Sequence, residues 1–390
     1  MKLAVYCQHV LGLGHLHRAI ELCRAFRGHR VLLLTGGPPV NVELPEHVRR
    51  VQLPALRMDA DFGGLSAVDA RVDLGTVKRR RQEMLERLFW SEKPDCLMTE
   101  LYPFGRKAFR FELDPLLETI TNRAGSSCGI FSSVRDILVE KDNAAKHEAR
   151  AVKLLNRYFD GVFVHAAPRL VRLEETFGRL DEIDIPLVYT GYVAPRPPPC
   201  ARERLRKKLR LAEGSLLVVA SAGGGQVGYR LLQATVAAAN LVRERMPLSL
   251  VVFTGPFMSR EHRHRLKETG GDWAAIETFS DEFLSYLAAA DLSISMGGYN
   301  TTMNLLATRV PAMVLPFAQN REQQLRAGRL ASRQALTLLT PEDLVPGRLA
   351  ERMAALMRQP LRACDAFDLD GAAATASWIE RWFRQRDKNR

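Results

Sequence analysis

The chain has 390 residues, of which 46% are hydrophobic and 26% are charged, and its formal net charge is +12. This length is large for a single core and suits two domains, and the composition is that of a globular protein. The apolar runs are too short to span a bilayer, which excludes a membrane-spanning chain. Residues 1–18 lack a signal-peptide core and a cleavage site, so we expect a cytoplasmic protein.

The net charge bears on the expected partners, and the cysteines bear on the state of the thiols. We find no recognisable nucleic-acid-binding module, so nucleic acid is not an expected partner. The positive charge suits an anionic membrane surface or a phosphorylated ligand, and a plain compositional bias towards arginine explains it equally well. The cysteines are scattered without a C-x-x-C pair, which favours reduced thiols over a disulfide frame or a zinc site. They are Cys7, Cys23, Cys96, Cys128, Cys200 and Cys364.

The first predicted strand, residues 3–6, leads through a glycine turn into a predicted helix. In an open parallel sheet such a turn lies at the carboxyl end of the strands, where ligands bind. The turn places His15 at the helix start, and a histidine with a near-neutral pKa is a natural general base for an attacking hydroxyl group. The alternative is that His15 only caps or packs the turn.

Polar side chains follow two later strands of the first half. Glu100 comes directly after the predicted strand 95–99, where it could bind acceptor hydroxyls or assist the base, or serve as a buried carboxylate with a structural partner. Arg135 and Asp136 follow the predicted strand 128–133 and either bind the acceptor or pair with each other. Further strands are predicted at residues 30–34, 48–53, 161–165 and 187–193.

Two other features of the first half have competing interpretations. Residues 58–66 form a predicted polar loop in which Asp59-Ala60-Asp61 has the spacing of a metal-diphosphate site. The same spacing recurs at 368–370, so we interpret both as chance copies and expect no metal site. Residues 71–93 predict a long amphipathic helix with a basic run at 78–81. That helix suits an anionic membrane surface, or it is a core helix with a solvated outer face.

Dense proline at 195–199 predicts a stiff linker. We therefore expect a first domain at 1–194, a linker at 195–200 and a second domain at 201–365. In the second domain, Gly223, Gly224 and Gly225 lie between a predicted strand and a predicted helix. Glycines in that position favour close approach of the backbone to a phosphate or a sugar.

The stretch 291–327 reads as strand, glycine turn, helix, strand, polar loop and helix. Gly297-Gly298 let a ligand approach the helix start, whose N–H groups suit a diphosphate. Asn300-Thr301-Thr302 offer cap-type side chains at that start. The polar residues of 317–323 follow the strand 312–315 and would lie beside the same site. A diphosphate on one loop and sugar hydroxyls on the next describe a nucleotide-sugar site.

These runs resemble the MurG-like glycosyltransferases, which have the two-domain GT-B fold. The matching residues are Met296-Gly297-Gly298-Tyr299-Asn300-Thr301, Pro316, Glu322-Gln323 and Arg326-Ala327, with a glycine-rich first loop that carries His15. A family glutamate that resembles a ribose ligand is Asn304 here, so an acceptor oxygen and an NH₂ group replace a carboxylate. The alternative is an ordinary βαβ crossover with a polar loop, because fold alone never fixes function.

The resemblance implies an α/β fold of two doubly wound, Rossmann-like parallel-sheet domains that face each other across a cleft, with residues 366–390 crossing back to the first domain. It implies inverting, metal-independent hexosyl transfer from a UDP-sugar to an unidentified hydroxyl acceptor that is lipid-linked or a small molecule, without a cofactor. Peripheral contact with the inner face of the membrane would suit a lipid-linked acceptor. His15 and Glu100 are the implied catalytic pair. The implied acceptor-side residues are His9, Gly12, Gly14, Arg18, Arg135 and Asp136. The implied donor-binding residues are Gly223, Gly224, Gly225, Gln226, Gly255, Phe279, Ser280, Leu284, Gly297, Gly298, Tyr299, Asn300, Thr301, Thr302, Asn304, Gln319, Glu322 and Gln323.

Two other functions share this architecture. A nucleotide-sugar epimerase would release an altered sugar without an acceptor, and it would need a cleft lined more fully with carboxylates. A non-catalytic nucleotide-sugar-binding protein would bind the donor without turnover, and Asn304 favours that alternative.

Overall fold

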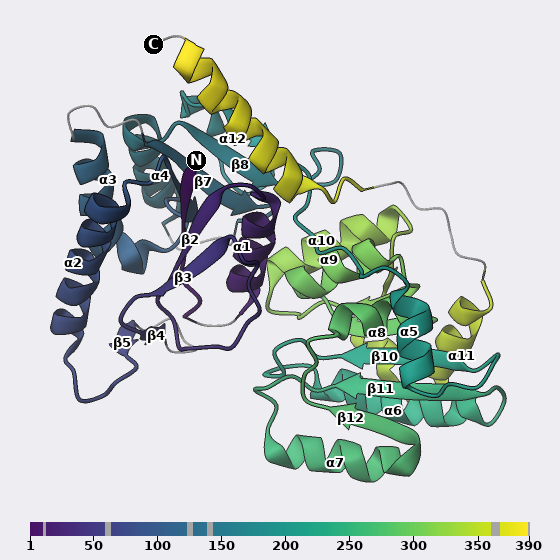
Figure 1. The fold of residues 1–390 in the computed structure, drawn as a ribbon. Coiled ribbons are helices and arrows are strands. Elements are labelled where there is room, and N and C mark those ends of the chain that lie inside the picture. The colour runs from purple at the N-terminus through teal and green to yellow at the C-terminus, as the bar shows by residue number, and fades with distance from the viewer. Residues whose placement is uncertain (11–12, 59–63, 123–127, 139–142, 360–366, 389–390) are drawn as a thin grey trace. The chain divides into compact units, whose positions relative to one another are not determined.

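The computed structural model describes the chain except for residues 11–12, 59–63, 123–127, 139–142, 360–366 and 389–390. The described residues divide into two compact units (Figure 1). The first unit contains Met1–Val193 together with Asp368–Arg390, and the second contains Ala194–Phe367. Each unit is a parallel sheet with helices on both faces, so the predicted α/β class with Rossmann-like sheets is confirmed.

The sheet of the first unit has the strand order β3-β2-β1-β6-β7-β8-β9 among the described residues, and every neighbouring pair is parallel. Along β1, Ala4 and Tyr6 face one hydrophobic cluster and Leu3 and Val5 face the other. A strand with both faces buried reads as a continuous apolar run, which is why the sequence predicts these strands well. The strands are β1 Lys2–Cys7, β2 Arg30–Thr35, β3 Val48–Gln52, β6 Cys96–Glu100, β7 Gly129–Arg135, β8 Gly161–His165 and β9 Leu187–Tyr189.

The C-terminal helix α12 (Gly371–Lys388) completes the core of the first unit. Trp378 and Trp382 meet the ring of Phe131 edge-on, at centroid distances of 5.8 and 5.3 Å. Edge-to-face packing of this kind stabilises an aromatic core beyond the area that it buries. The other helices of the unit are α1 Gly14–Ala25, α2 Leu74–Glu92, α3 Arg110–Asn122 and α4 Ala144–Tyr158.

Two predictions for the first unit need correction. The polar loop predicted at 58–66 includes parts of an antiparallel pair, β4 (Leu56–Met58) and β5 (Leu65–Ala67), and Asp59 and Asp61 lie outside the described residues. The basic face predicted for α2 is smaller than its sequence suggests. Arg81 is fully buried, and the ammonium of Lys78 lies 5.1 Å from the centre of the Phe111 ring.

The sheet of the second unit has the order β12-β11-β10-β13-β14-β15 among the described residues, again all parallel. The reversal of strand order lies between β10 and β13, and ligands of doubly wound sheets bind at the carboxyl ends of such neighbouring strands. The strands are β10 Leu216–Ser221, β11 Leu248–Phe253, β12 Ala274–Glu277, β13 Leu292–Met296, β14 Ala312–Leu315 and β15 Thr337–Leu338. The helices are α5 Ala201–Lys208, α6 Tyr229–Arg243, α7 Arg260–Gly270, α8 Phe283–Ala289, α9 Tyr299–Thr308, α10 Arg321–Ser332 and α11 Pro346–Met357.

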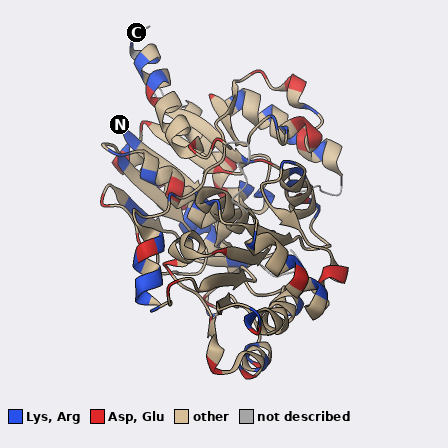
Figure 2. Cartoon of the chain, turned by 90° about the vertical axis from the view of Figure 1, so that its right-hand side faces the viewer, with Lys and Arg blue, Asp and Glu red and all other residues tan. Residues whose placement is uncertain are grey.

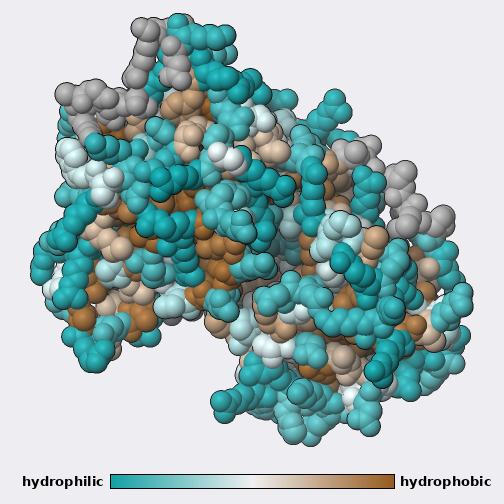
Figure 3. Space-filling model, in the orientation of Figure 1, coloured by the Kyte–Doolittle hydropathy of each residue, from teal (hydrophilic) through white to brown (hydrophobic). Residues whose placement is uncertain are grey.

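Charged and apolar residues are mixed on the surface. Figure 2 shows basic and acidic residues interspersed along the helices, and Figure 3 shows apolar patches between hydrophilic residues. Trp90 of α2 is one exposed apolar side chain, with 54% of its surface accessible. Within the described part of the chain, no helix is both long and apolar enough to cross a membrane.

Candidate functional site

The two predicted catalytic side chains are in direct contact. His15 is the second residue of α1, and Glu100 is the last residue of β6, which pairs with β1. His15 Nδ1 lies 2.7 Å from Glu100 Oε1, and the side chains are 21% and 1% exposed. The N-cap residue of α1 is Leu13, and its side chain makes no capping hydrogen bond. His15 lies inside α1 rather than at its N-cap position, so it does not cap this helix start.

Arginines surround this pair. Arg18 is buried and donates to Glu100 Oε1, and Arg106 Nη2 lies 3.6 Å from Glu100 Oε2. Burial by itself would raise the pKa of the Glu100 carboxyl group, but the charges of His15, Arg18 and Arg106 hold this pKa below its ordinary value. Glu100 therefore stays ionised at neutral pH.

His15 is neutral at the same pH. Its burial, together with the charges of Arg106 and Arg135, lowers the pKa of the imidazole to about 4, although Glu100 opposes this shift. A neutral imidazole carries one proton, and here Nδ1–H donates it to Glu100. The lone pair is then on Nε2. This arrangement can accept a proton from a hydroxyl group, with the carboxylate orienting the ring and stabilising the imidazolium that forms.

The other acceptor-side candidates have different surroundings. His9 is buried, its Nε2 lies 2.9 Å from the carbonyl oxygen of Pro38, and burial lowers its pKa. Asp136 is fully buried and accepts from the backbone N–H of Ile137 at 3.0 Å. Arg135 is partly exposed, and Gly14 is the exposed first residue of α1. Gly12 lies outside the described residues.

In the second unit the glycine turn leads directly into α9. Gly298 is the N-cap residue, α9 begins at Tyr299, and no side chain caps this start. The prediction that Asn300, Thr301 and Thr302 provide caps is therefore wrong, and the hydroxyl of Thr302 instead donates to the carbonyl oxygen of Gly298 at 3.0 Å. A Cβ atom added to Gly298 would meet nothing within 4 Å, so the space beside the helix start is open. An uncapped, accessible helix N-terminus suits an anion.

The polar loop after β14 is held by its own side chains. Gln323 Oε1 accepts from the N–H of Phe317, and Asn320 Oδ1 accepts from the N–H of Gln323, both at 3.0 Å. Glu322 is 6% exposed and accepts from Arg326 Nη2 at 2.6 Å. Gln319 exposes its side chain.

The same loop is linked to the start of α9. The guanidinium carbon of Arg326 lies 4.9 Å from the centre of the Tyr299 ring, a cation–π contact that joins α9 to α10. Asn304 is partly buried in the second turn of α9, and its carbonyl oxygen accepts from the hydroxyl of Thr308 at 2.9 Å. The glycine turn and the polar loop therefore form one connected element.

The run Gly223–Gly225 has a structural reason for its glycines. A Cβ atom on Gly225 would lie 2.4 Å from the carbonyl oxygen of Thr254, and one on Gly255 would lie 2.3 Å from that of Gly223. Two loops thus approach each other backbone to backbone, which Gly permits. Gly223, Gly224 and Gln226 remain exposed and available to a ligand.

The loop after β12 carries the remaining donor candidates. Phe279 is 56% exposed. Ser280 Oγ accepts from the N–H of Glu282 at 3.1 Å, and Leu284 lies in the first turn of α8. Sequence reasoning missed Phe257, which is 55% exposed on the neighbouring loop after β11, and Arg106 beside Glu100. The signal for both was present, because each follows a turn at the carboxyl end of a predicted strand.

Among the residues that the structure describes, no cluster of three or more His, Cys, Asp or Glu side chains could hold a metal ion. Asp368 Oδ1 instead accepts from the N–H of Asp370 at 3.0 Å.

Part of this chain is similar to known glycosyltransferases. Residues 218–373 match the glycosyltransferase family 28 C-terminal domain. An uncharacterized glycosyltransferase of Methanopyrus kandleri is 24% identical over 52% of this chain and 57% of its own length. The UDP-N-acetylglucosamine–N-acetylmuramyl-(pentapeptide) pyrophosphoryl-undecaprenol N-acetylglucosamine transferase of Desulforudis audaxviator is 29% identical over 41% of this chain and 44% of its own length. The chain thus spans about half the length of the curated relatives that it matches.

Solved structures share the fold over nearly the whole chain. CalG4, the calicheamicin glycosyltransferase, has a TM-score of 0.62 at 16% identity and covers 97% of this chain and 98% of its own. MurG of Acinetobacter baumannii has a TM-score of 0.56 at 15% identity and covers 98% of this chain and 100% of its own. These neighbours show that the fold is GT-B. Residues 218–373 are the part of the chain that matches the family 28 C-terminal domain.

Proposed function

We propose that the protein transfers a hexose from a UDP-sugar to a hydroxyl acceptor, with inversion at the anomeric carbon and without a metal ion. The observation that carries this proposal is the His15–Glu100 pair, with Glu100 buried and His15 neutral and oriented, in a chain whose residues 218–373 match a family 28 domain. A group with these properties serves as a general base, and an acceptor hydroxyl needs one when it attacks.

The donor's diphosphate would bind at the start of α9. Gly298 leaves open space there, and the backbone N–H groups and the helix dipole favour negative charge. These groups would also stabilise the charge that grows on the leaving diphosphate, which is the role a metal ion has in other enzymes. The name of the Desulforudis relative includes UDP-N-acetylglucosamine, which supports a UDP-linked donor.

The reaction would take place in one displacement. His15 Nε2 accepts the proton of the acceptor hydroxyl, and that oxygen attacks the anomeric carbon. The bond from this carbon to the diphosphate oxygen breaks, and UDP leaves with the electron pair. Glu100 keeps the ring in the tautomer that has its lone pair on Nε2 and stabilises the transient imidazolium.

The similar proteins bear on the acceptor and on the location. The Desulforudis relative acts on a pyrophosphoryl-undecaprenol, as its name states, and this supports a lipid-linked acceptor here, with a peripheral position at the inner face of the membrane. A small-molecule acceptor is the second candidate, which fits the fold of CalG4.

Incubation of the protein with a panel of UDP-sugars tests the proposal. Slow release of UDP, and loss of that release in His15→Ala with UDP affinity retained, is the expected result. Conversion of one UDP-sugar into its epimer would show an epimerase instead. Binding of the nucleotide without any turnover, by the wild-type protein with every donor and alcohol supplied, would show a binding protein.

A further inference from the structure

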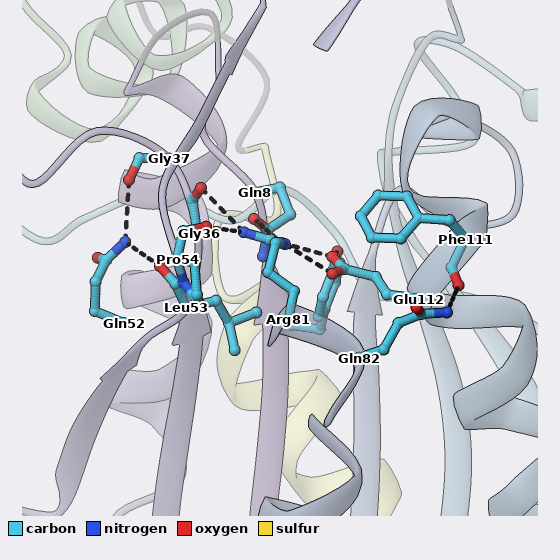
Figure 4. Close-up of polar contacts among 11 residues, drawn as sticks. Gln8, Gly36, Gly37, Gln52, Leu53, Pro54, Arg81, Gln82, Phe111 and Glu112 are labelled. Atoms are coloured by element: carbon cyan, nitrogen blue, oxygen red, sulfur yellow. Dashed lines mark hydrogen bonds and ion pairs between the residues drawn. The ribbon is translucent and has the colours of Figure 1, made fainter. Parts of the chain in front are cut away.

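A fully buried arginine lies where three loops of the first unit meet (Figure 4). Arg81 of α2 has no exposed surface. Its guanidinium makes two parallel bonds with Glu112 of α3, from Nε to Oε2 at 2.7 Å and from Nη2 to Oε1 at 2.6 Å. The hydroxyl of Tyr6 in β1 donates to the same carboxylate. A buried ion pair that is bonded on both sides holds its surroundings in one geometry.

The remaining bonds of Arg81 go to the loops. Nη1 donates to the carbonyl oxygens of Gly36 at 3.2 Å and Pro54 at 2.8 Å, and Nη2 donates to Gln8 Oε1 at 2.9 Å. Gly36, Pro54 and Gln8 follow β2, β3 and β1, three adjacent strands of the sheet. One side chain thus ties together three loops at the carboxyl edge, where the acceptor-side candidates lie.

The contact extends towards the loop that carries His15. Gln8 begins the connection from β1 to α1, and the next residue, His9, is bonded to Pro38 and packed against Gly37. A Cβ atom on Gly37 would lie 2.4 Å from the carbonyl oxygen of His9. Residues 8 and 9 of this connection are therefore held through Arg81 and Pro38, and the start of α1 is held by the bond from His15 to Glu100.

We propose that Arg81 is a positioning residue for the transfer reaction: by fixing the start of the β1–α1 connection and the loops beside it, it sets the position of His15 without touching a substrate. This inference rests on the proposed function for its catalytic consequence, but not for its structural one. A fully buried cation is costly to desolvate, and apolar residues of similar volume often replace such pairs without loss of stability. A role in positioning explains why the chain places an arginine there.

The first test removes both charges with the double variant Arg81→Met/Glu112→Gln. The net charge is unchanged and the amide oxygen introduced by Glu112→Gln can still accept from Tyr6, so no lone charge is left buried. NMR of histidine-labelled protein follows the titration of His15, assigned with His15→Gln. The charges that act most on His15 are those of Glu100, Arg106 and Arg135. A change in the pKa of His15 would therefore show that its ring has moved, not that the charge of Arg81 has been lost.

The double variant should shift the His15 titration towards the ordinary imidazole range. It should also slow UDP release from UDP-N-acetylglucosamine by about ten- to a hundredfold, since misplacing a catalytic group by an ångström has effects of this size. UDP affinity should be unchanged. An unchanged His15 titration and an unchanged rate in a variant that is only less stable would overturn the proposal.

A milder variant disturbs the same guanidinium without removing any charge. In Gly36→Ala the new Cβ would lie 2.1 Å from Arg81 Nη1 and 2.3 Å from Gln8 Oε1, so the bonded pair of side chains must move. Gly178→Ala is the matched control in the same unit, because its Cβ would meet only Glu148 Oε2 at 3.4 Å. Gly36→Ala should shift the His15 titration and Gly178→Ala should not; equal behaviour of the two would also overturn the proposal. Failure of the wild-type protein to release UDP from any donor would count against the proposed function, while the NMR comparison would still decide the role of Arg81.

Discussion

The candidate site of the first unit is formed by side chains, and that of the second unit is formed by the backbone. In the first unit, side chains form the site: His15 and Arg18 both bond to the buried Glu100, and Arg81 fixes the loops nearby. In the second unit, the backbone forms it: α9 starts without a side-chain cap, beside an open Gly298. A side-chain site can change its protonation, whereas a backbone site offers fixed dipoles. We therefore expect substitutions in the first unit to change the rate of chemistry and those in the second to change donor affinity.

The largest effect that would test this comparison is the loss of the base. His15→Ala should lower the rate of UDP release by about 10²- to 10⁴-fold, the usual contribution of a general base. The dissociation constant for UDP should stay within about twofold, because every proposed donor contact lies in the second unit. Both quantities are available from turnover assays and calorimetry on one preparation. Loss of UDP affinity together with activity would break the division between the units.

Removal of the carboxylate should come next. Glu100→Gln keeps the shape but loses the charge that orients His15, and we expect a rate about a hundredfold lower. Arg18 would then be buried opposite a neutral group, so the free energy of unfolding should also fall by about 3 kcal/mol. Urea denaturation measures this loss of unfolding free energy separately from the rate. A variant that is destabilised but turns over normally would show that Glu100 has only a structural role.

The pH dependence of the rate reports on the same pair. The active form of His15 is neutral and its pKa is about 4, so the rate should be constant from pH 7 to about 5. Below the pKa the rate should fall about tenfold per pH unit. Since Glu100 raises the pKa of His15, Glu100→Gln should move this fall to still lower pH. A fall centred at the ordinary imidazole value would indicate that another group is titrating.

The same pKa also affects stability. The folded-state pKa of His15 lies below the unfolded one, so folding favours the neutral ring. This contribution to the free energy of unfolding is fully present above pH 6.5 and is lost as the pH falls from there to about 4. Thermal unfolding of the wild-type protein and of His15→Gln over this range should therefore converge towards acid pH.

The open glycine at α9 tests the second unit. Gly298 has φ −61° and ψ 147°, a conformation that Ala adopts freely, and its Cβ would meet nothing within 4 Å. Gly298→Ala should leave the fold intact and weaken UDP binding about tenfold, or ~1.4 kcal/mol, if the diphosphate approaches this backbone. Gly347→Ala is the control, because its Cβ also meets nothing within 4 Å. Equal affinities for the two variants would place the diphosphate elsewhere.

The division between side chains and backbone also separates what the sequence predicts from what it cannot. Buried parallel strands are apolar on both faces, so their ends, and with them Glu100 and Gly297, are visible from local pattern. Side-chain partners depend on residues distant in the chain. Arg81 looks like part of a solvated basic run until it is seen to meet Glu112, which is 31 positions away. Glu322 and Arg326, by contrast, are only four positions apart on α10, a spacing at which opposite charges pair, so the sequence could have predicted their bond.

The smallest predicted effect concerns Asn304, which stands where the MurG-like run that this sequence resembles has a glutamate. Asn304 lies in the second turn of α9, close to the proposed diphosphate, and is partly buried. A carboxylate can accept from both hydroxyls of a ribose, whereas the amide has one acceptor oxygen. Asn304→Glu should therefore tighten UDP binding by a few-fold, since one added hydrogen bond contributes about 1 kcal/mol. The gain should disappear with 2′-deoxy-UDP, which lacks one of the two hydroxyls. An equal gain in affinity for both nucleotides would mean that the new charge acts on the helix rather than on the sugar ring. Residue 304 would then not bind the ribose hydroxyls in this protein.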